Sequence, residues 1–208
     1  MDSSQLLNEG KLLPLMEEFY SLQGEGTHAG KAAWFIRIGG CDVGCRWCDS
    51  KESWIAGYHP LTPTDEIVAH AVQCPAQAVV VTGGEPLLYN LDYLCAKLKE
   101  HGIKTYLETS GSEKLSGQWD WICLSPKRNA PPQAEMFQRA DELKVIVYDE
   151  SDFDWAEANA RFVLPGCRLL LQPEWSRYKT LIPHIVNYIL QHPEWGVSLQ
   201  SHKFMRIP

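Results

Sequence analysis

Hydrophobic and polar positions along the 208-residue chain form short apolar runs that alternate with amphipathic stretches. Apolar runs rich in β-branched and aromatic residues predict strands, whereas apolar residues spaced by three and four predict helices. The predicted strands cover residues 12–22, 32–38, 78–81, 104–107, 121–124, 142–147, 168–171 and 197–201. The predicted helices cover residues 63–73, about 91–101, a short segment ending at 137–140, 152–160 and 180–191.

This alternation predicts an α/β protein with a mostly parallel sheet and helices outside it. The repeated part contains about six or seven strands, fewer than the eight of a closed (β/α) barrel of about 250 residues. We therefore expect an incomplete or modified TIM-like (β/α) barrel in a single domain, residues 1–208. Residues 1–31 would form an N-terminal strand and loop, 32–201 the partial barrel and 202–208 a tail.

Polar and glycine residues collect where the predicted strands end. The ends carry Cys41, Thr82-Gly83-Gly84-Glu85, Glu108-Thr109-Ser110, Ser125-Pro126-Lys127, Gln172-Pro173 and His202-Lys203. Taken alone, Gly83-Gly84-Glu85-Pro86 is better explained as a turn, and Glu108 and Lys127 are equally well explained as surface residues. The carboxyl ends of parallel strands share one face, however, so we expect these residues to line one active-site mouth.

The stretch from Cys41 to Cys48 spaces three thiols as CxxxCxxC, directly after Gly39-Gly40. Three thiolates can hold an iron-sulfur cluster and leave one iron open, whereas electron-transfer [4Fe-4S] centres use four cysteines. Two other interpretations remain open: a zinc site, although no familiar fourth-ligand spacing is present, and buried thiols on one helix face. Glycines in this stretch make an uninterrupted helix costly, at about 1 kcal/mol each.

Composition narrows the class of protein. The seven cysteines are an odd number, and residues 1–10 are polar, so metal-bound or buried thiols are favoured over a disulfide framework. A net charge of −7 without any Lys/Arg run argues against nucleic-acid and membrane partners, and no apolar run spans a bilayer. We therefore expect a cytoplasmic protein with a small-molecule partner. The thiols expected to be inert in the core are Cys74, Cys95, Cys123 and Cys167.

Several motifs carry a resemblance to a known family. The cysteine stretch followed by Gly83-Gly84-Glu85-Pro86 resembles the radical S-adenosylmethionine (SAM) superfamily. Other motifs resemble one family within it, the 7-carboxy-7-deazaguanine synthases, from about residue 15 to the end. These motifs are Leu22-Gln23-Gly24-Glu25-Gly26, Phe35-Ile36-Arg37, Cys45-Arg46-Trp47-Cys48-Asp49-Ser50, Glu108-Thr109-Ser110-Gly111, Ser125-Pro126-Lys127 and Gln200-Ser201-His202-Lys203.

The resemblance implies a carbon-nitrogen lyase with a [4Fe-4S] cluster, SAM and Mg²⁺ as cofactors. Reductive cleavage of SAM would give methionine and a 5′-deoxyadenosyl radical, which takes a hydrogen from 6-carboxy-5,6,7,8-tetrahydropterin. Ring contraction with loss of ammonia would yield 7-carboxy-7-deazaguanine, a precursor of queuosine in tRNA modification. The family also suggests a homodimer and an external electron donor such as flavodoxin.

The resemblance further implies which residues bind each group. Cys41, Cys45 and Cys48 would hold the cluster. The cofactor-binding residues would be Trp47, Cys48, Asp49, Gly84, Glu85, Ser125, Pro126, Lys127 and Gln172. The pterin-binding residues would be Leu22, Gln23, Gly24, Arg37, Thr82, His202 and the carboxylate of Pro208.

Three of the implied residues have more specific roles. Arg37 is suited to the substrate carboxylate, because its planar guanidinium can bind a carboxylate bidentately. If the reaction uses a general base, Glu108 is the candidate; the alternative is that none is needed. Ser50 stands where the family usually has Thr, and its hydroxyl would be a Mg²⁺ ligand; the alternative is a helix-capping serine.

Two other functions stay open. A glycyl-radical activating enzyme shares the cysteine and GGE motifs, but it would not explain Gln23-Gly24-Glu25-Gly26 or Ser125-Pro126-Lys127. A non-catalytic module would instead use Cys41, Cys45 and Cys48 to hold zinc.

Overall fold

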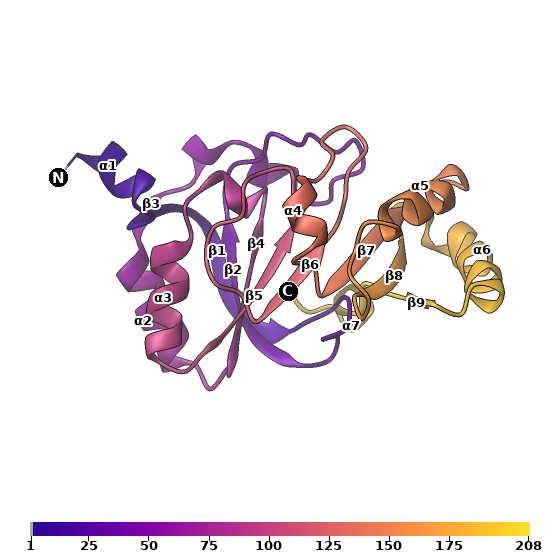
Figure 1. The fold of residues 1–208 in the computed structure, drawn as a ribbon. Helices are drawn as coiled ribbons and strands as arrows, with labels where there is room; N and C mark the ends of the chain where they lie inside the picture. Colours follow the sequence, from indigo (N-terminus) through magenta and orange to yellow (C-terminus); the bar gives the residue numbers. More distant parts are fainter. Residues whose placement is uncertain (1) are drawn as a thin grey trace.

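The computed structural model describes residues 2–208. Across these residues the strands form one sheet of nine, in the order β3-β1-β2-β4-β5-β6-β7-β8-β9 (Figure 1). The strands are β1 (Leu12–Leu22), β2 (Ala32–Ile38), β3 (Leu61–Pro63), β4 (Ala78–Gly83), β5 (Lys104–Thr109), β6 (Trp121–Leu124), β7 (Glu142–Val147), β8 (Arg168–Pro173) and β9 (Trp195–Val197).

Helices connect most of the strands. The α-helices are α1 (Ser3–Asn8), α2 (Thr64–Gln73), α3 (Asp92–Glu100), α4 (Ala134–Phe137), α5 (Ser151–Ala160), α6 (Tyr178–Gln191) and α7 (Ser201–Met205). Short 3₁₀ helices are η1 (Lys51–Trp54), η2 (Ala56–Tyr58), η3 (Pro86–Leu88) and η4 (Trp175–Arg177). In the part of the chain that is described, no helix has the length and apolar character needed to cross a membrane.

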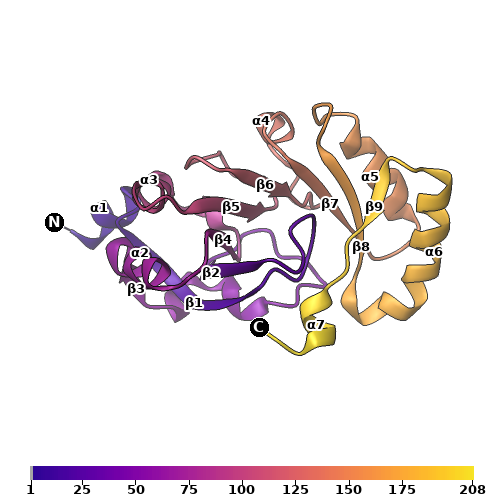
Figure 2. The ribbon, with the colours of Figure 1, turned by 90° about the horizontal axis from the view of Figure 1, so that it is seen from below.

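The sheet is mostly parallel, as the pattern of strands and helices predicted. β1 is antiparallel to β2 and to β3, and each neighbouring pair from β2 through β9 is parallel. Figure 2 shows the sheet curving into an open arc, with α7 beside the gap between β1 and β8. The predicted incomplete barrel is confirmed.

The interior strand β4 is covered on both faces. Val79 and Val81 belong to the main core between the sheet and the helices, whereas Val80 packs with Ala33 and Phe35 on the inner face. Because side chains of a strand alternate between faces, a strand covered on both sides has a continuous apolar sequence. This explains the uninterrupted valine run that predicted β4.

The loop between β1 and β2 folds into the concave side of the sheet. Its His28 ring stacks on Tyr106 of β5, with ring centroids 4.5 Å apart, and meets the edge of Trp121 of β6 at 4.6 Å. The backbone N–H of Thr27 donates to the buried carboxylate of Glu142, the first residue of β7, at 2.8 Å. The loop therefore fills space that a closed barrel would enclose.

Two predicted elements run into residues that belong to a different element in the structure. The strand predicted over 197–201 ends at Val197, and Ser201 starts α7 instead, because its N–H and hydroxyl both donate to the Gly24 carbonyl, at 2.8 and 2.9 Å. Pro63 is not the first residue of α2 but the last of β3. The helix begins at Thr64, whose hydroxyl donates to the Gly10 carbonyl at 2.7 Å.

Truncation of a core side chain should measure how much the stability depends on this packing. Leu107 of β5 is 0% exposed, so Leu107→Ala should lower the free energy of unfolding by about 2 to 5 kcal/mol, through lost burial and an unfilled cavity. Urea unfolding measures the change. Leu190→Ala on α6 is the matched control, because Leu190 is 78% exposed; equal losses in the two variants would contradict the described core.

Candidate active site

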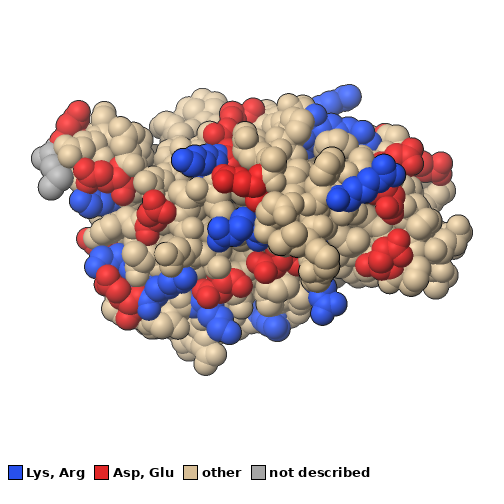
Figure 3. Space-filling model, viewed as in Figure 1, with Lys and Arg blue, Asp and Glu red and all other residues tan. Residues whose placement is uncertain are grey.

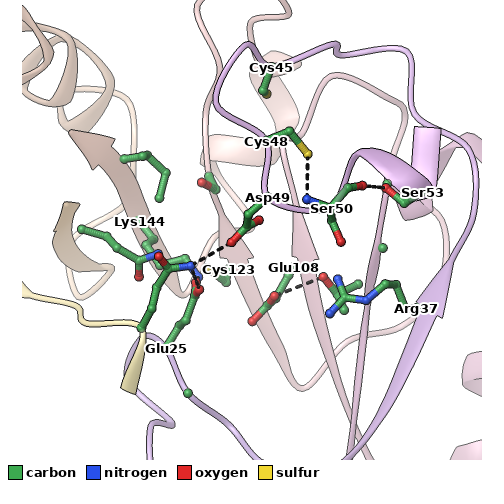
Figure 4. A pocket seen from close by; sticks show the side chains of 18 of the residues that line it. Glu25, Arg37, Cys45, Cys48, Asp49, Ser50, Ser53, Glu108, Cys123 and Lys144 are labelled. Atoms are coloured by element: carbon green, nitrogen blue, oxygen red, sulfur yellow. Dashed lines mark hydrogen bonds and ion pairs between the residues drawn. The ribbon is translucent and has the colours of Figure 1, made fainter. Parts of the chain in front are cut away.

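A cavity of about 410 Å³ opens at the carboxyl ends of the parallel strands. Figure 4 shows Cys45 and Cys48 at one end of it and Arg37 and Glu108 at the other, with Ser50 between them. The cysteine thiols and the Glu108 carboxylate therefore line the same cavity, as predicted from their positions after the ends of the strands.

The structure brings the predicted site residues together with one exception. Those on the cavity wall are Leu22, Gln23, Gly24, Arg37, Cys41, Cys45, Trp47, Cys48, Asp49, Ser50, Thr82, Gly84, Glu85, Glu108, Ser125, Lys127, Gln172, His202 and Pro208. Pro126 is the exception. It is buried between Ser125 and Lys127 and does not reach the wall, so its contact with the cofactor stays a prediction.

The cysteine loop is held in an irregular conformation, not in a helix. Gly40 and Cys41 donate their backbone N–H groups to Ser53 and Trp54, at 2.6 and 3.1 Å. The thiols of Cys41, Cys45 and Cys48 are free and line the cavity. Nowhere in residues 2–208 do three His, Cys, Asp or Glu side chains converge on a site for one metal ion.

Two of these thiols are sufficiently buried to change their pKa. Burial raises the pKa of Cys41, and burial also raises that of Cys45, against the opposing charge of Lys127. Both are therefore protonated thiols at neutral pH in the free protein. Binding of an iron-sulfur cluster would have to release these protons, because thiolates are the ligands.

The loop after β4 lies directly against the cysteine loop. The N–H of Gly84 donates to the Ile38 carbonyl at 2.9 Å, and that of Glu85 donates to the Gly40 carbonyl at 2.8 Å. A Cβ on Gly84 would lie 2.1 Å from the Gly40 oxygen. Glycine is therefore required at position 84 by the close approach of two backbones.

The carboxylate of Glu85 is satisfied inside the protein. The residue is 1% exposed and accepts hydrogen bonds from Thr109 Oγ1 at 2.6 Å, from Leu87 N at 3.1 Å and from both N and Oγ of Ser110 at 2.8 and 2.5 Å. Glu85 thus connects the glycine loop to the end of β5.

A second carboxylate, Glu108, lies on the cavity wall and accepts two hydrogen bonds. Gln23 Nε2 donates to one oxygen at 2.9 Å and Thr82 Oγ1 to the other at 3.1 Å. Arg37 faces the same part of the cavity (Figure 4) and donates its Nε to Glu17 at 2.7 Å. This end of the cavity therefore offers a guanidinium, an amide and a carboxylate to a polar ligand.

An ion pair that we did not predict anchors the loop after β1. Lys144 in β7 lies 2.5 Å from Glu25, and both side chains are largely buried, at 5% and 18% exposure. Burial raises the pKa of Glu25, but the Lys144 ammonium and several hydrogen bonds outweigh it and lower the value to about 2. The signal available in the sequence was a lysine between the apolar residues Leu143 and Val145 of a parallel strand.

Cys123 is buried, as predicted, but its surroundings are not entirely apolar. Its side chain lies on the cavity wall, and its Sγ–H donates to Glu142 Oε1 at 3.3 Å. Burial raises the pKa of Cys123 well above its usual range. Apolar neighbours in sequence did not reveal this polar surrounding, because Glu142 comes from the next strand.

The residues after the cysteines face different partners. Ser50 occupies the N-cap position of η1, but its side chain makes no capping hydrogen bond, which removes the capping explanation for a serine there. Asp49 pairs with Lys203. Lys127 donates to the carbonyl and hydroxyl of Ser125, at 2.5 and 2.7 Å, and lies 5.7 Å from the Trp47 ring.

The C-terminal segment closes one side of the cavity. A Cβ on Gly24 would lie 2.1 Å from the His202 ring, so these two residues are in direct contact. Burial lowers the pKa of His202, which leaves the imidazole neutral at pH 7. Ser21 Oγ donates to the Pro208 carbonyl oxygen at 3.3 Å, which places the last residue at the cavity.

A partial (β/α) barrel with a CxxxCxxC loop held against a glycine-rich loop at its mouth is the architecture of a radical SAM protein. The family model of the radical SAM superfamily matches residues 35–122. A 7-carboxy-7-deazaguanine synthase from Flavobacterium psychrophilum is 52% identical over 202 residues, 97% of this chain and 96% of the relative. One from Synechocystis sp. is 50% identical over 194 residues, 93% of each chain.

A solved structure agrees with the sequence relatives. The crystal structure of QueE from Escherichia coli has a TM-score of 0.83 and 26% identity, and the match covers 97% of this chain and 99% of that one. The chain belongs to the 7-carboxy-7-deazaguanine synthase family of radical SAM enzymes. This family membership excludes the two other predicted functions, a glycyl-radical activating enzyme and a non-catalytic zinc-binding module.

The residues present fit the cofactors of this family. Three free thiols on one wall, without a fourth cysteine in their loop, are the donor set of a [4Fe-4S] cluster with one open iron. Gly84 lies on the same wall, in backbone contact with the cysteine loop.

Removal of the Glu25 charge should destabilise the protein in a pH-dependent way. The pKa of Glu25 falls from 4.5 to about 2 on folding, and each unit is worth about 1.4 kcal/mol, so Glu25→Gln should cost about 3 kcal/mol at pH 7. The stabilisation is present above the unfolded pKa and is lost as the pH falls towards 2, so the difference from wild type should shrink markedly by about pH 3.

Urea unfolding at pH 7 and pH 3 measures this difference. Glu100→Gln is the control, because Glu100 also pairs with a lysine, Lys97, but is 59% exposed. A loss for Glu25→Gln that is independent of pH would show that the ionised carboxylate is not the stabilising group.

Proposed function

We propose that this protein converts 6-carboxy-5,6,7,8-tetrahydropterin to 7-carboxy-7-deazaguanine with loss of ammonia, as a carbon-nitrogen lyase of queuosine biosynthesis. The observation that carries the proposal is a single cavity that joins three free thiols to an end lined by Arg37 and Glu108. The family membership of the chain supports the same substrate and product.

The thiol end is the cofactor site in this proposal. Cys41, Cys45 and Cys48 would hold a [4Fe-4S] cluster and leave one iron without a protein ligand, available to SAM. When bound and reduced, the cluster would supply the electron for the reductive cleavage of SAM that starts the reaction. The remaining contacts to SAM come from Trp47, Cys48, Asp49, Gly84, Ser125, Lys127 and Gln172.

Glu85 acts indirectly in this proposal. Its carboxylate already accepts hydrogen bonds from Thr109, Ser110 and Leu87, so it positions the glycine loop. The backbone beside Gly84 is then the group that meets the methionyl ammonium, since carbonyl oxygens accept hydrogen bonds from an ammonium.

The opposite end is the pterin site. The residues that we assign to it are Leu22, Gln23, Gly24, Arg37, Thr82, His202 and Pro208. Arg37 binds the carboxylate of the pterin, since a guanidinium offers parallel donors to a carboxylate. Glu108, held by Gln23 and Thr82, is the group in reach to accept a proton during ring contraction.

Magnesium is placed between the two ends in this proposal. Ser50 lies between the cysteines and Arg37 (Figure 4), and its hydroxyl is not used as a helix cap. Mg²⁺ prefers oxygen ligands and keeps several waters, so the serine hydroxyl and the pterin carboxylate suffice as further ligands.

The remaining partners follow from the family and from composition. The enzyme receives electrons from an external donor such as flavodoxin, forms a homodimer and works in the cytoplasm, where its free thiols stay reduced. Charges of both signs are interspersed on the face drawn in Figure 3, without a wide basic area of the kind that binds nucleic acid or membranes.

An anaerobic assay tests this function. The protein is reconstituted with iron and sulfide, reduced, and given SAM with or without 6-carboxytetrahydropterin, and products are identified by mass spectrometry. We expect 5′-deoxyadenosine, methionine and 7-carboxy-7-deazaguanine. Deoxyadenosine without a deazaguanine product would contradict the substrate, and a colourless protein without deoxyadenosine would contradict the reaction class.

Arg37→Ala should separate substrate binding from cofactor cleavage. Loss of the guanidinium removes a charge-assisted contact worth about 1.5 to 3 kcal/mol, so the KM for the pterin should rise by about 10- to 100-fold. Uncoupled SAM cleavage without substrate should persist. Equal loss of both activities would show that Arg37 does not belong to the substrate end.

Ser50→Ala should alter the response to magnesium. If the Ser50 hydroxyl is a ligand, the alanine variant should need more Mg²⁺ for half-maximal product formation, by about tenfold, whereas Ser50→Thr should keep or improve the wild-type response. Product formation is titrated with Mg²⁺ for all three proteins. Identical titrations would remove Ser50 from the metal site.

A further inference from the structure

We propose that Gln200 is a positioning residue that couples pterin binding at one end of the cavity to SAM binding at the other. The inference rests on the proposed function and adds to it a means of communication between the two ligands. It concerns one amide group that contacts both the loop after β1 and the cysteine loop.

The side-chain amide of Gln200 bridges two carboxylates. Its Nε2 donates to Glu25 Oε1 at 2.9 Å and to Asp49 Oδ2 at 3.2 Å. Figure 4 shows Glu25 and Asp49 on the same side of the cavity. An amide nitrogen has two hydrogens, so this one group can serve both carboxylates at once.

Each carboxylate is also held by a cation from another element. Glu25 pairs with Lys144 of β7, and Asp49 pairs with Lys203 of α7. Without the neutral amide between them, the two negative groups would repel each other across a partly buried space. The arrangement therefore has a defined geometry that depends on a donor at position 200.

The backbone next to Gln200 extends this connection to the substrate end. Ser201 donates both its N–H and its hydroxyl to the Gly24 carbonyl, at 2.8 and 2.9 Å, and His202 contacts Gly24 directly. A ligand seated on Gly24 and His202 therefore orders the start of α7, and with it the Gln200 amide.

The Gln200 amide also contacts the cofactor end of the cavity, through its hydrogen bond to Asp49. This residue follows Cys48 directly and is more than half exposed, at 56%, so few other contacts hold its side chain. The Gln200 amide thus fixes Asp49 when the substrate loop is in place. A contiguous chain of hydrogen bonds of this kind can carry coupling between two sites.

Coupling between two ligands is reciprocal, which makes it measurable without turnover. If pterin binding orders Asp49 for SAM, then SAM must raise pterin affinity by the same factor. Coupling energies of this type change affinity by about 5- to 150-fold. The chain offers a matched control in Gln138, an exposed glutamine that donates to the Phe162 carbonyl at 2.9 Å, away from the cavity.

The test measures pterin affinity by anaerobic calorimetry on the reconstituted, unreduced enzyme, with and without SAM. In wild type and in Gln138→Leu, SAM should tighten binding of 6-carboxytetrahydropterin by at least about fivefold. In Gln200→Leu the factor should fall below about twofold, while binding of the pterin alone changes little. A factor in Gln200→Leu equal to that of wild type would overturn the inference.

A second variant and a second measurement distinguish a positioning role of Gln200 from a general loss of structure. Gln200→Glu keeps the size of the side chain but places a third carboxylate beside Glu25 and Asp49, so it should also lose the coupling. In both variants the ratio of deoxyadenosine to deazaguanine product should rise. A folded variant with the product ratio and the affinity coupling of wild type would refute the role of the amide. A wild-type enzyme that does not bind the pterin would instead refute the proposed function.

Discussion

Two backbone hydrogen bonds between neighbouring loops determine how the active site is built. They run from Gly84 N–H to the Ile38 carbonyl and from Glu85 N–H to the Gly40 carbonyl, at 2.9 and 2.8 Å. Because they join main-chain atoms, the cysteine loop and the glycine loop have a fixed relative position that does not depend on flexible side chains. Parallel pairing of β2 with β4 places the two loops side by side, and the buried Glu85 carboxylate then attaches them to the end of β5.

The substrate end is constructed differently, from charged and polar contacts between distant segments. The sheet does not close, so the loop after β1 and the segment after β9 fill its open side. The loop after β1 is anchored by Lys144 and Glu142 of β7, which hold Glu25 and Thr27. Such buried polar contacts stabilise only when each partner is satisfied. This dependence explains why so many of the side chains at this end are hydrogen-bonded to each other.

Much of the fold and of the site could be predicted, because both follow from local patterns. The valine run of β4 and the strand-end positions of Cys41, Glu108 and Lys127 were sufficient to assemble one cavity wall. The errors have a common physical origin in contacts between residues far apart in sequence. The end of β9 is decided by the Gly24 carbonyl, the surroundings of Cys123 by Glu142, and the pairing of Lys144 by Glu25. None of these partners is visible in a local window of sequence.

Three thiolates, from Cys41, Cys45 and Cys48, should leave one iron of a [4Fe-4S] cluster open for SAM. Pulsed electron paramagnetic resonance on the reduced, reconstituted enzyme tests this open iron with SAM labelled at the amino nitrogen and the carboxylate oxygens. We expect hyperfine coupling from the cluster to both labels, and loss of that coupling when Cys41, Cys45 or Cys48 is replaced by alanine. A cluster spectrum that labelled SAM leaves unchanged in the wild-type enzyme would show that no iron is open to SAM.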